Sequence, residues 1–201
     1  MKKLLSAFAA IIVGTTPIIS QPSVDVSVFS RHAWRGQAGP SSPSIQPEIA
    51  VPLGQTGTSL SVWGQVPIQG DSTEYDITLS QKVADIGTIA VTSYYYNGPF
   101  LDKDNHDIEV TVGASYAGID FTVGRFINGS AVDGDMWIEA GYDLGGLAVF
   151  AGAGDGSYVS EGDGLSLVLL GASATNDEGY GASLLYNVDT ETPFIIASKA
   201  W

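Results

Sequence analysis

The sequence predicts an all-β chain that folds as an antiparallel up-and-down transmembrane β-barrel of about twelve strands, with ten or eight strands as alternatives. Three observations predict this fold. The apolar content comes from Val, Ile and aromatic residues set among 25 Gly, which is typical of strands. Segments of about ten residues alternate apolar and polar side chains. The connections between these segments alternate between long and short, as in membrane-spanning barrels.

Composition excludes several classes of protein. The chain has 201 residues, which suits a single domain. It has no Cys, which excludes disulfides, metal–thiolate sites and thiol nucleophiles. Eight Lys and Arg stand against 22 Asp and Glu, a net charge of −14. This balance argues against binding nucleic acid, which requires clustered basic residues.

The first 20 residues have the pattern of a signal peptide. Lys2 and Lys3 precede an apolar run over residues 4–13, and Ser20 is a small residue at a plausible cleavage point. The run is too short for a membrane-spanning helix, although an uncleaved anchor is the alternative. We therefore expect residues 1–20 to direct export and residues 21–201 to form the barrel.

The period-two alternation divides the rest of the chain into strands. The expected ranges are 24–35, 44–52, 58–67, 73–84, 86–97, 106–116, 118–127, 135–144, 146–154, 165–174, 179–188 and 193–201. Four of them show the alternation most plainly, with polar or small residues between the apolar ones. Their apolar sets are, in chain order, Leu60, Val62 and Val66; Tyr75, Ile77, Leu79 and Val83; Ile108, Val110, Val112 and Tyr116; and Met136, Ile138, Tyr142 and Leu144.

The connections indicate how the strands are arranged. The first, third, fifth, seventh and ninth are long, whereas Asp85, Ala117 and Gly145 are nearly single-residue turns. The eleventh, residues 189–192, is an exception because it is short. Outer-membrane barrels have short periplasmic turns and long external loops. An even number of strands places both termini on the periplasmic side, as an exported barrel requires.

The charged face of the strands is expected to enclose the lumen, because a charge in hydrocarbon is costly. Arg31 and Arg35 fall on the inward face of the first strand, where we expect them to pair with luminal carboxylates. Whether they line a pore or brace a filled interior stays open. The expected pore-lining residues are Arg31, Arg35, Glu48, Glu74, Asp76, Lys82, Glu109, Asp120 and Glu139.

Aromatic residues on the apolar face fall near strand ends, which predicts girdles at the two membrane interfaces. The expected interface aromatics are Trp34, Tyr75, Tyr95, Tyr116, Tyr142, Tyr180, Tyr186 and Trp201. Trp201 ends the last strand and resembles the C-terminal signal that the outer-membrane assembly machinery reads. Lys199 shares its face and is expected to extend toward lipid headgroups.

Two stretches resemble the TorF-type family of outer-membrane porins. The first is Ser-Arg-His-Ala-Trp-Arg-Gly at 30–36, followed by Pro-Ser-Ile-Gln-Pro at 43–47. The second combines Ser-Val-Trp-Gly at 61–64, Glu-Tyr-Asp at 74–76 and the Tyr-rich run at 94–99. His32 departs from the family's usual Tyr. The resemblance covers about the first half of the mature chain and implies a porin-like barrel without an established substrate.

No catalytic constellation stands out, so we expect neither an enzyme nor a cofactor or metal site. His32 and His106 are the two histidines and lie on different elements. His32 is expected to be packed or interfacial rather than a ligand. The acidic segment at 102–107 lacks the Gly and the distal Glu of an EF-hand loop, which favours a solvated external loop.

These patterns favour a small channel in the cell outer membrane through which small solutes diffuse. Its acidic mouth predicts a preference for cations or neutral solutes over anions. The expected partners are outer-membrane lipid, lipopolysaccharide, small solutes and, through the strand ending at Trp201, the assembly machinery. The alternatives are a non-conducting structural or adhesive barrel with acidic surface loops and a secreted soluble β-sandwich binding module.

Overall fold

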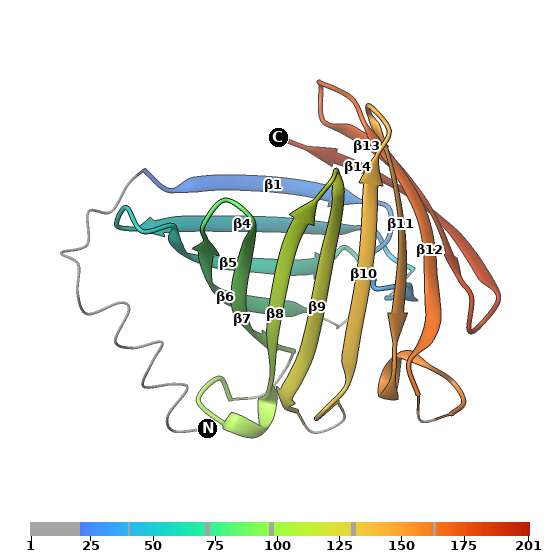
Figure 1. The fold of residues 1–201 in the computed structure, drawn as a ribbon, viewed down its shortest axis with the longest axis horizontal. Coiled ribbons are helices and arrows are strands. Elements are labelled where there is room, and N and C mark those ends of the chain that lie inside the picture. Colours follow the sequence, from blue (N-terminus) through green and yellow to red (C-terminus); the bar gives the residue numbers. More distant parts are fainter. Residues whose placement is uncertain (1–20, 40, 71–72, 97–98, 130–131, 163) are drawn as a thin grey trace.

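The described part of the chain is a closed antiparallel barrel (Figure 1). The computed structural model describes residues 21–39, 41–70, 73–96, 99–129, 132–162 and 164–201. The expected signal peptide, residues 1–20, lies outside them. The twelve barrel strands are β1 (Ser23–Phe29), β4 (Ser44–Leu53), β5 (Thr58–Pro67), β6 (Glu74–Val83), β7 (Gly87–Tyr95), β8 (His106–Tyr116), β9 (Ile119–Asn128), β10 (Met136–Asp143), β11 (Leu147–Gly154), β12 (Ser166–Thr175), β13 (Tyr180–Asn187) and β14 (Thr192–Ala200).

Each strand pairs with its neighbours in sequence, and β1 closes the barrel between β4 and β14. This confirms the predicted all-β, twelve-strand, up-and-down barrel. The β-sandwich alternative is wrong, because the strands form one closed sheet rather than two stacked ones. The expected bounds of the strands at 58–67 and 106–116 are the observed ones.

The first strand is shorter than expected. It was expected to run to residue 35, but β1 ends at Phe29 and the chain then turns away from the sheet. Residues 33–38 instead form a small separate hairpin from β2 (Ala33–Trp34) and β3 (Gln37–Ala38). Arg31 and Arg35 therefore do not lie on a barrel strand, which corrects their predicted position.

The short turns gather at one end of the barrel and most of the long connections at the other. Figure 1 shows the turns that follow β8 and β10 at the upper edge and the longer connections at the lower edge. Two of the long connections contain single-turn 3₁₀ helices, η1 (Lys103–Asn105) and η2 (Gly156–Tyr158). None of the described helices is long and apolar enough to cross a membrane.

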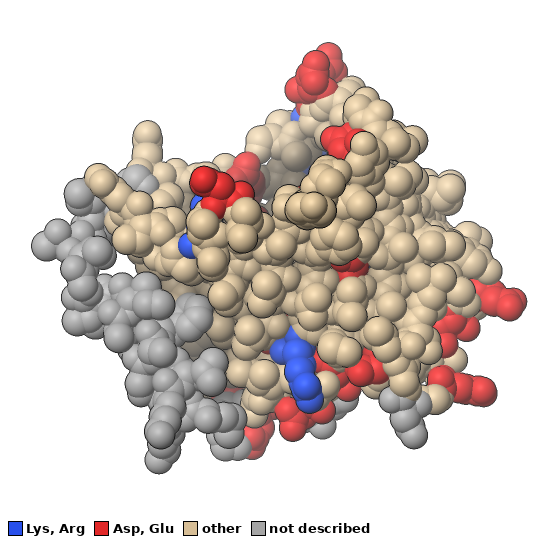
Figure 2. Space-filling model, in the orientation of Figure 1, with Lys and Arg blue, Asp and Glu red and all other residues tan. Residues whose placement is uncertain are grey.

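The outward face of the barrel is apolar, as the alternation predicts. Val62 and Ile195, for example, expose 45% and 73% of their surface. Figure 2 shows an outer surface with few charged residues across its middle and acidic residues mainly toward its upper and lower margins. The inward face holds Glu109, which is fully buried, and the aromatic residues Tyr94, Phe126 and Trp137. Most of the charged residues of the strands are inside and apolar surface is outside, the reverse of a soluble β-sandwich.

Candidate functional site

The connection between β1 and β4, residues 30–43 and here called loop 1, folds into the barrel. Its hairpin tip is Arg35 and Gly36, both in the left-handed backbone region with φ of 48° and 80°. A Cβ atom on Gly36 would lie 3.2 Å from the side chain of Leu169. The carbonyl oxygen of Gly36 accepts a hydrogen bond from the buried Asn187 amide at 2.9 Å. Glycine therefore lets the tip lie directly against the inner wall of β12 and β13.

Arg35 is held by a network of hydrogen bonds inside the barrel. Its guanidinium donates to both carboxylate oxygens of Glu109, at 2.6 and 2.9 Å, and to the Tyr158 hydroxyl at 2.5 Å. Tyr94 donates its hydroxyl proton to Glu109 at 2.7 Å. This bidentate, charge-assisted geometry satisfies a carboxylate that has no access to solvent.

The environment keeps Arg35 charged. Burial alone would lower the pKa of Arg35, but the hydrogen bond and the negative charge of Glu109 raise it overall. The guanidinium carbon lies 4.4 Å from the centroid of the Trp34 ring, a cation–π contact. We call Arg35, Glu109, Tyr94, Tyr158 and Trp34 the Arg35 cluster.

Glycines on the barrel strands make room for the large inward side chains. A Cβ on Gly124 would lie 2.1 Å from the Glu109 carboxylate, and one on Gly152 would lie 2.1 Å from the Trp137 ring. Both glycines are on strands next to the residues they accommodate. The wall of the barrel is therefore shaped around the Arg35 cluster and its aromatic neighbours.

The other side of loop 1 faces β5 and β6. The Gln46 amide donates to Nδ1 of His32 at 3.2 Å, so a neutral His32 carries its proton on Nε2, which is 3.9 Å from the Glu74 carboxylate. The His32 ring packs on Trp63 with centroids 5.7 Å apart. Burial lowers the pKa of His32, which favours its neutral form. His32 is packed, as the sequence predicts.

Two polar groups near His32 lack hydrogen-bond partners in the described part of the chain. They are Nε2 of Gln65 and Oδ1 of Asp76, both shielded from solvent. Gln65 lies opposite Glu74 in the β5–β6 register, and Trp63 lies opposite Asp76. We call Trp63, Gln65, Glu74 and Asp76 the acidic wall.

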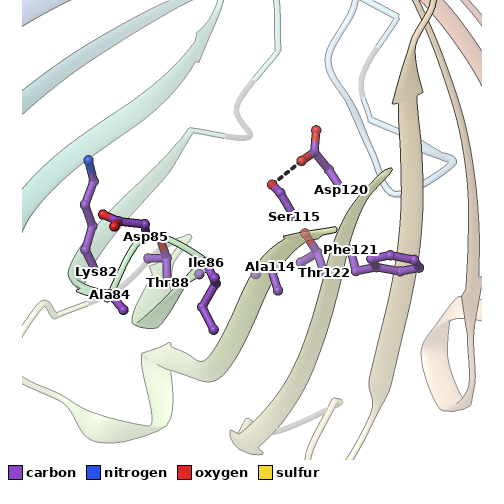
Figure 3. A pocket seen from close by; sticks show the side chains of 12 residues that line it. Lys82, Ala84, Asp85, Ile86, Thr88, Ala114, Ser115, Asp120, Phe121 and Thr122 are labelled. Carbon is purple, nitrogen blue, oxygen red and sulfur yellow. Dashed lines mark hydrogen bonds between the residues drawn. The ribbon is translucent and has the colours of Figure 1, made fainter. Parts of the chain in front are cut away.

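One cavity lies in the interior and another at the short-turn rim of the barrel. One of about 280 Å³ is bounded by Arg31, Arg35, Gln46 and Glu139, next to loop 1. Another of about 450 Å³ opens at the short-turn end, where Figure 3 shows Lys82 and Asp85 on one side and a hydrogen bond from Ser115 to Asp120 on the other. Polar groups thus line the cavity beside loop 1 and the cavity at the short-turn end.

The residues predicted to line a pore fall into two groups. Arg31 and Arg35 are in loop 1, and the Arg31 guanidinium donates to the Gly39 carbonyl at 3.3 Å. The other seven are on barrel strands in the inward phase of the alternation. These are Glu48, Glu74, Asp76, Lys82, Glu109, Asp120 and Glu139. Their contact with a passing solute stays a prediction.

Among the predicted interface aromatics, Trp34 is misplaced. It lies inside the barrel because loop 1 turns inward before it. The centroid of its ring is 5.5 to 6.2 Å from those of Tyr94, Phe126 and Tyr158. The other seven are on the outward face or at the end of the last strand, with exposures such as 80% for Tyr116 and 68% for Trp201. Tyr75 and Tyr95 stack side by side near the long loops, with centroids 6.3 Å apart.

Sequence reasoning did not identify Tyr94, Tyr158 or Gln65 as part of the site. Tyr158 is in a long connection, where no periodicity marks it as inward. Tyr94 and Gln65 do have the inward phase of their strands, and this phase is the signal that would have found them. In the acidic segment 102–107, the Asp102 side chain accepts a hydrogen bond from the Asp104 backbone, and no described cluster of His, Asp or Glu is placed to hold a metal ion.

Comparison with known proteins adds little to this picture. No protein-family model and no curated protein matches the chain. A solved structure of a triple mutant of the porin from Rh. blastica matches with 16% sequence identity and a TM-score of 0.48. The match covers 78% of this chain and 55% of the porin chain. We draw no functional argument from a likeness this distant.

Proposed function

We propose that this protein is a small channel of the bacterial outer membrane through which small solutes diffuse. The observation that carries the proposal is a closed barrel whose outward face is mainly apolar and whose inward face holds most of the charged residues of the strands. A bilayer requires all backbone polar groups of a spanning segment to be paired, and a closed barrel meets this requirement. The resemblance of residues 30–36 to TorF-type porins agrees with it.

Loop 1 sets the width of the proposed channel. Because the Arg35 cluster holds it inside the barrel, solutes have to pass beside it. The passage is therefore narrower than the barrel, which restricts it to small solutes.

The proposed channel favours cations or neutral solutes over anions. Arg35 is committed to Glu109, whereas Glu48, Glu74, Asp76 and Glu139 add negative charge to the interior. A charge of one sign in a low-dielectric passage raises the local concentration of the opposite ion. Lipid, lipopolysaccharide and, through the strand ending at Trp201, the assembly machinery are the partners we propose.

Planar-bilayer recordings test this function. The refolded chain should produce small, ohmic conductance steps, and a KCl gradient should give a reversal potential of the sign of cation selectivity. Anion selectivity would refute the preference. Absence of steps from protein whose migration on a gel is heat-modifiable, and which is therefore folded, would refute the channel.

A non-conducting structural or adhesive barrel is the second candidate. The observation that favours it is loop 1 itself, whose fixed position inside the barrel is that of a plug. Liposome swelling separates the two candidates. Swelling in small neutral sugars supports the channel, and no swelling at equal protein incorporation supports the plug.

A further inference from the structure

Loop 1 is held more tightly on one side of the interior than on the other. Its tip is fixed to β8 through Glu109 and to β12 and β13 through Gly36. Around the tip the buried residues are mainly aromatic or aliphatic, among them Phe126, Trp137 and Leu169. Toward β5 and β6 the contacts of loop 1 are looser, with the His32–Glu74 approach at 3.9 Å. The side of loop 1 that is held less tightly is therefore the one that faces the acidic wall.

The acidic wall carries polar groups that the protein itself does not satisfy. Gln65 is only 2% exposed, yet its amide Nε2 has no hydrogen-bond partner in the described part of the chain. Oδ1 of Asp76, on the neighbouring strand, is also shielded from solvent and without a hydrogen-bond partner among the described residues. A buried donor or acceptor without a partner is costly, so these two groups require a partner from the lumen.

The acidic wall also lacks a basic partner for Asp76 among the described residues. Of the described basic side chains, Arg35 pairs with Glu109 and none forms an ion pair with Asp76. Burial and the field of two further carboxylates, Glu74 and Glu109, both disfavour the charged form of Asp76 unless a cation lies beside it. His32 of loop 1 approaches Glu74 at 3.9 Å, and it is neutral when it accepts from Gln46. A carboxylate in this setting favours a mobile cation beside it.

We propose, building on the channel function above, that Asp76 and Gln65 form a binding site for a small hydrated cation at the constriction. Asp76 accepts hydrogen bonds from the hydration shell, and Gln65 donates to an oxygen of the same shell. The Trp63 ring, opposite Asp76 in the β5–β6 register, offers a π face to the cation. A site with a single carboxylate and retained water binds weakly, which lets an ion enter and leave.

Asp76→Asn tests the site in the intact chain, because it removes the charge with almost no change in shape. In a KCl gradient, the cation-to-anion permeability ratio should fall about twofold or more. Asp120→Asn is the matched control, since it removes one carboxylate at the short-turn end, outside the acidic wall. Its ratio should change much less. Heat-modifiable migration confirms that each variant is folded.

Quenching of Trp63 fluorescence by Cs⁺ gives a readout that does not require conduction. The contribution of Trp63 is the difference between the chain and its Trp63→Phe variant, each in detergent micelles. Asp76→Asn should lower the Cs⁺ quenching constant of Trp63 about twofold and should not lower quenching by iodide. Reduced Cs⁺ quenching in a barrel that does not conduct would refute the channel and keep the site. Equal quenching and equal reversal potentials in the chain and Asp76→Asn would overturn the site.

Discussion

At the scale of single residues, the ion pair of Arg35 and Glu109 depends on the glycine beside it. A methyl group on Gly124 would lie 2.1 Å from the Glu109 carboxylate. We expect Gly124→Ala to displace that carboxylate and to lower the free energy of unfolding by about 1–3 kcal/mol, measured by urea titration of the refolded barrel. In the control Gly113→Ala, the nearest atom is 3.8 Å away, so stability should hardly change. Equal losses in both variants would contradict this assignment.

Arg35 itself should be the most sensitive position of loop 1. Arg35→Ala leaves the fully buried Glu109 without its charge partner, which should destabilise the barrel by about 3–5 kcal/mol. Arg35→Lys should recover only part of this loss, because an ammonium group lacks the planar fork that binds both carboxylate oxygens. Arg31→Ala is the control, since Arg31 donates to one backbone carbonyl. Urea midpoints that rank Arg31→Ala below Arg35→Ala would contradict the account.

The sequence predicts which residues of the site face inward, but it does not predict their partners. The inward phase of Glu74, Asp76 and Glu109 follows from strand periodicity alone, because charge and alternation are local properties. The partners of these side chains are not local. Arg35 contacts Glu109, which is 74 residues away in sequence, and Tyr158, which is 123 residues away. No pattern within the separate segments specifies these contacts.

At the scale of elements, loop 1 acts as the constriction. Replacing residues 31–39 with a short Gly-Ser link should raise single-channel conductance by about twofold or more, because it removes the hairpin from the lumen. The barrel should still form, since each strand keeps its paired neighbours. Trimming the connection between β5 and β6, which contains no residue of the Arg35 cluster, is the control and should leave conductance unchanged. Unchanged conductance in the loop 1 variant would show that the hairpin does not limit flow.

Loop 1 is also the element that sequence reasoning misassigned. Residues 30–35 continue the alternation of β1, so periodicity extends the strand through Arg31, Trp34 and Arg35. The strand ends at Phe29, and the chain gains the ion pair of Arg35 with Glu109 and the packing of Trp34 among aromatic rings. This gain depends on the assembled barrel, whereas a period-two pattern reports only on the segment that carries it.

At the scale of the whole molecule, the fold was predictable because each strand carries its own signal. Twelve alternating segments and the contrast between short and long connections specify an up-and-down barrel before any contact is known. The seam that closes it is brief, with three residue pairs between β1 and β14. At its short-turn end, the Lys199 ammonium lies 4.9 Å from the ring centroids of Tyr180 and Trp201 and donates to two backbone carbonyls.

Cysteine accessibility in lipid bilayers tests most directly whether the outward face meets lipid and the inward face meets water. The chain has no Cys, so single substitutions report without background. Ser61 and Val62 are consecutive residues of β5 on opposite faces of the wall. A small water-soluble thiol reagent should label Ser61→Cys and leave Val62→Cys unreacted in the bilayer, with both labelled after denaturation. Rapid labelling of Val62→Cys together with protection of Ser61→Cys would contradict the account.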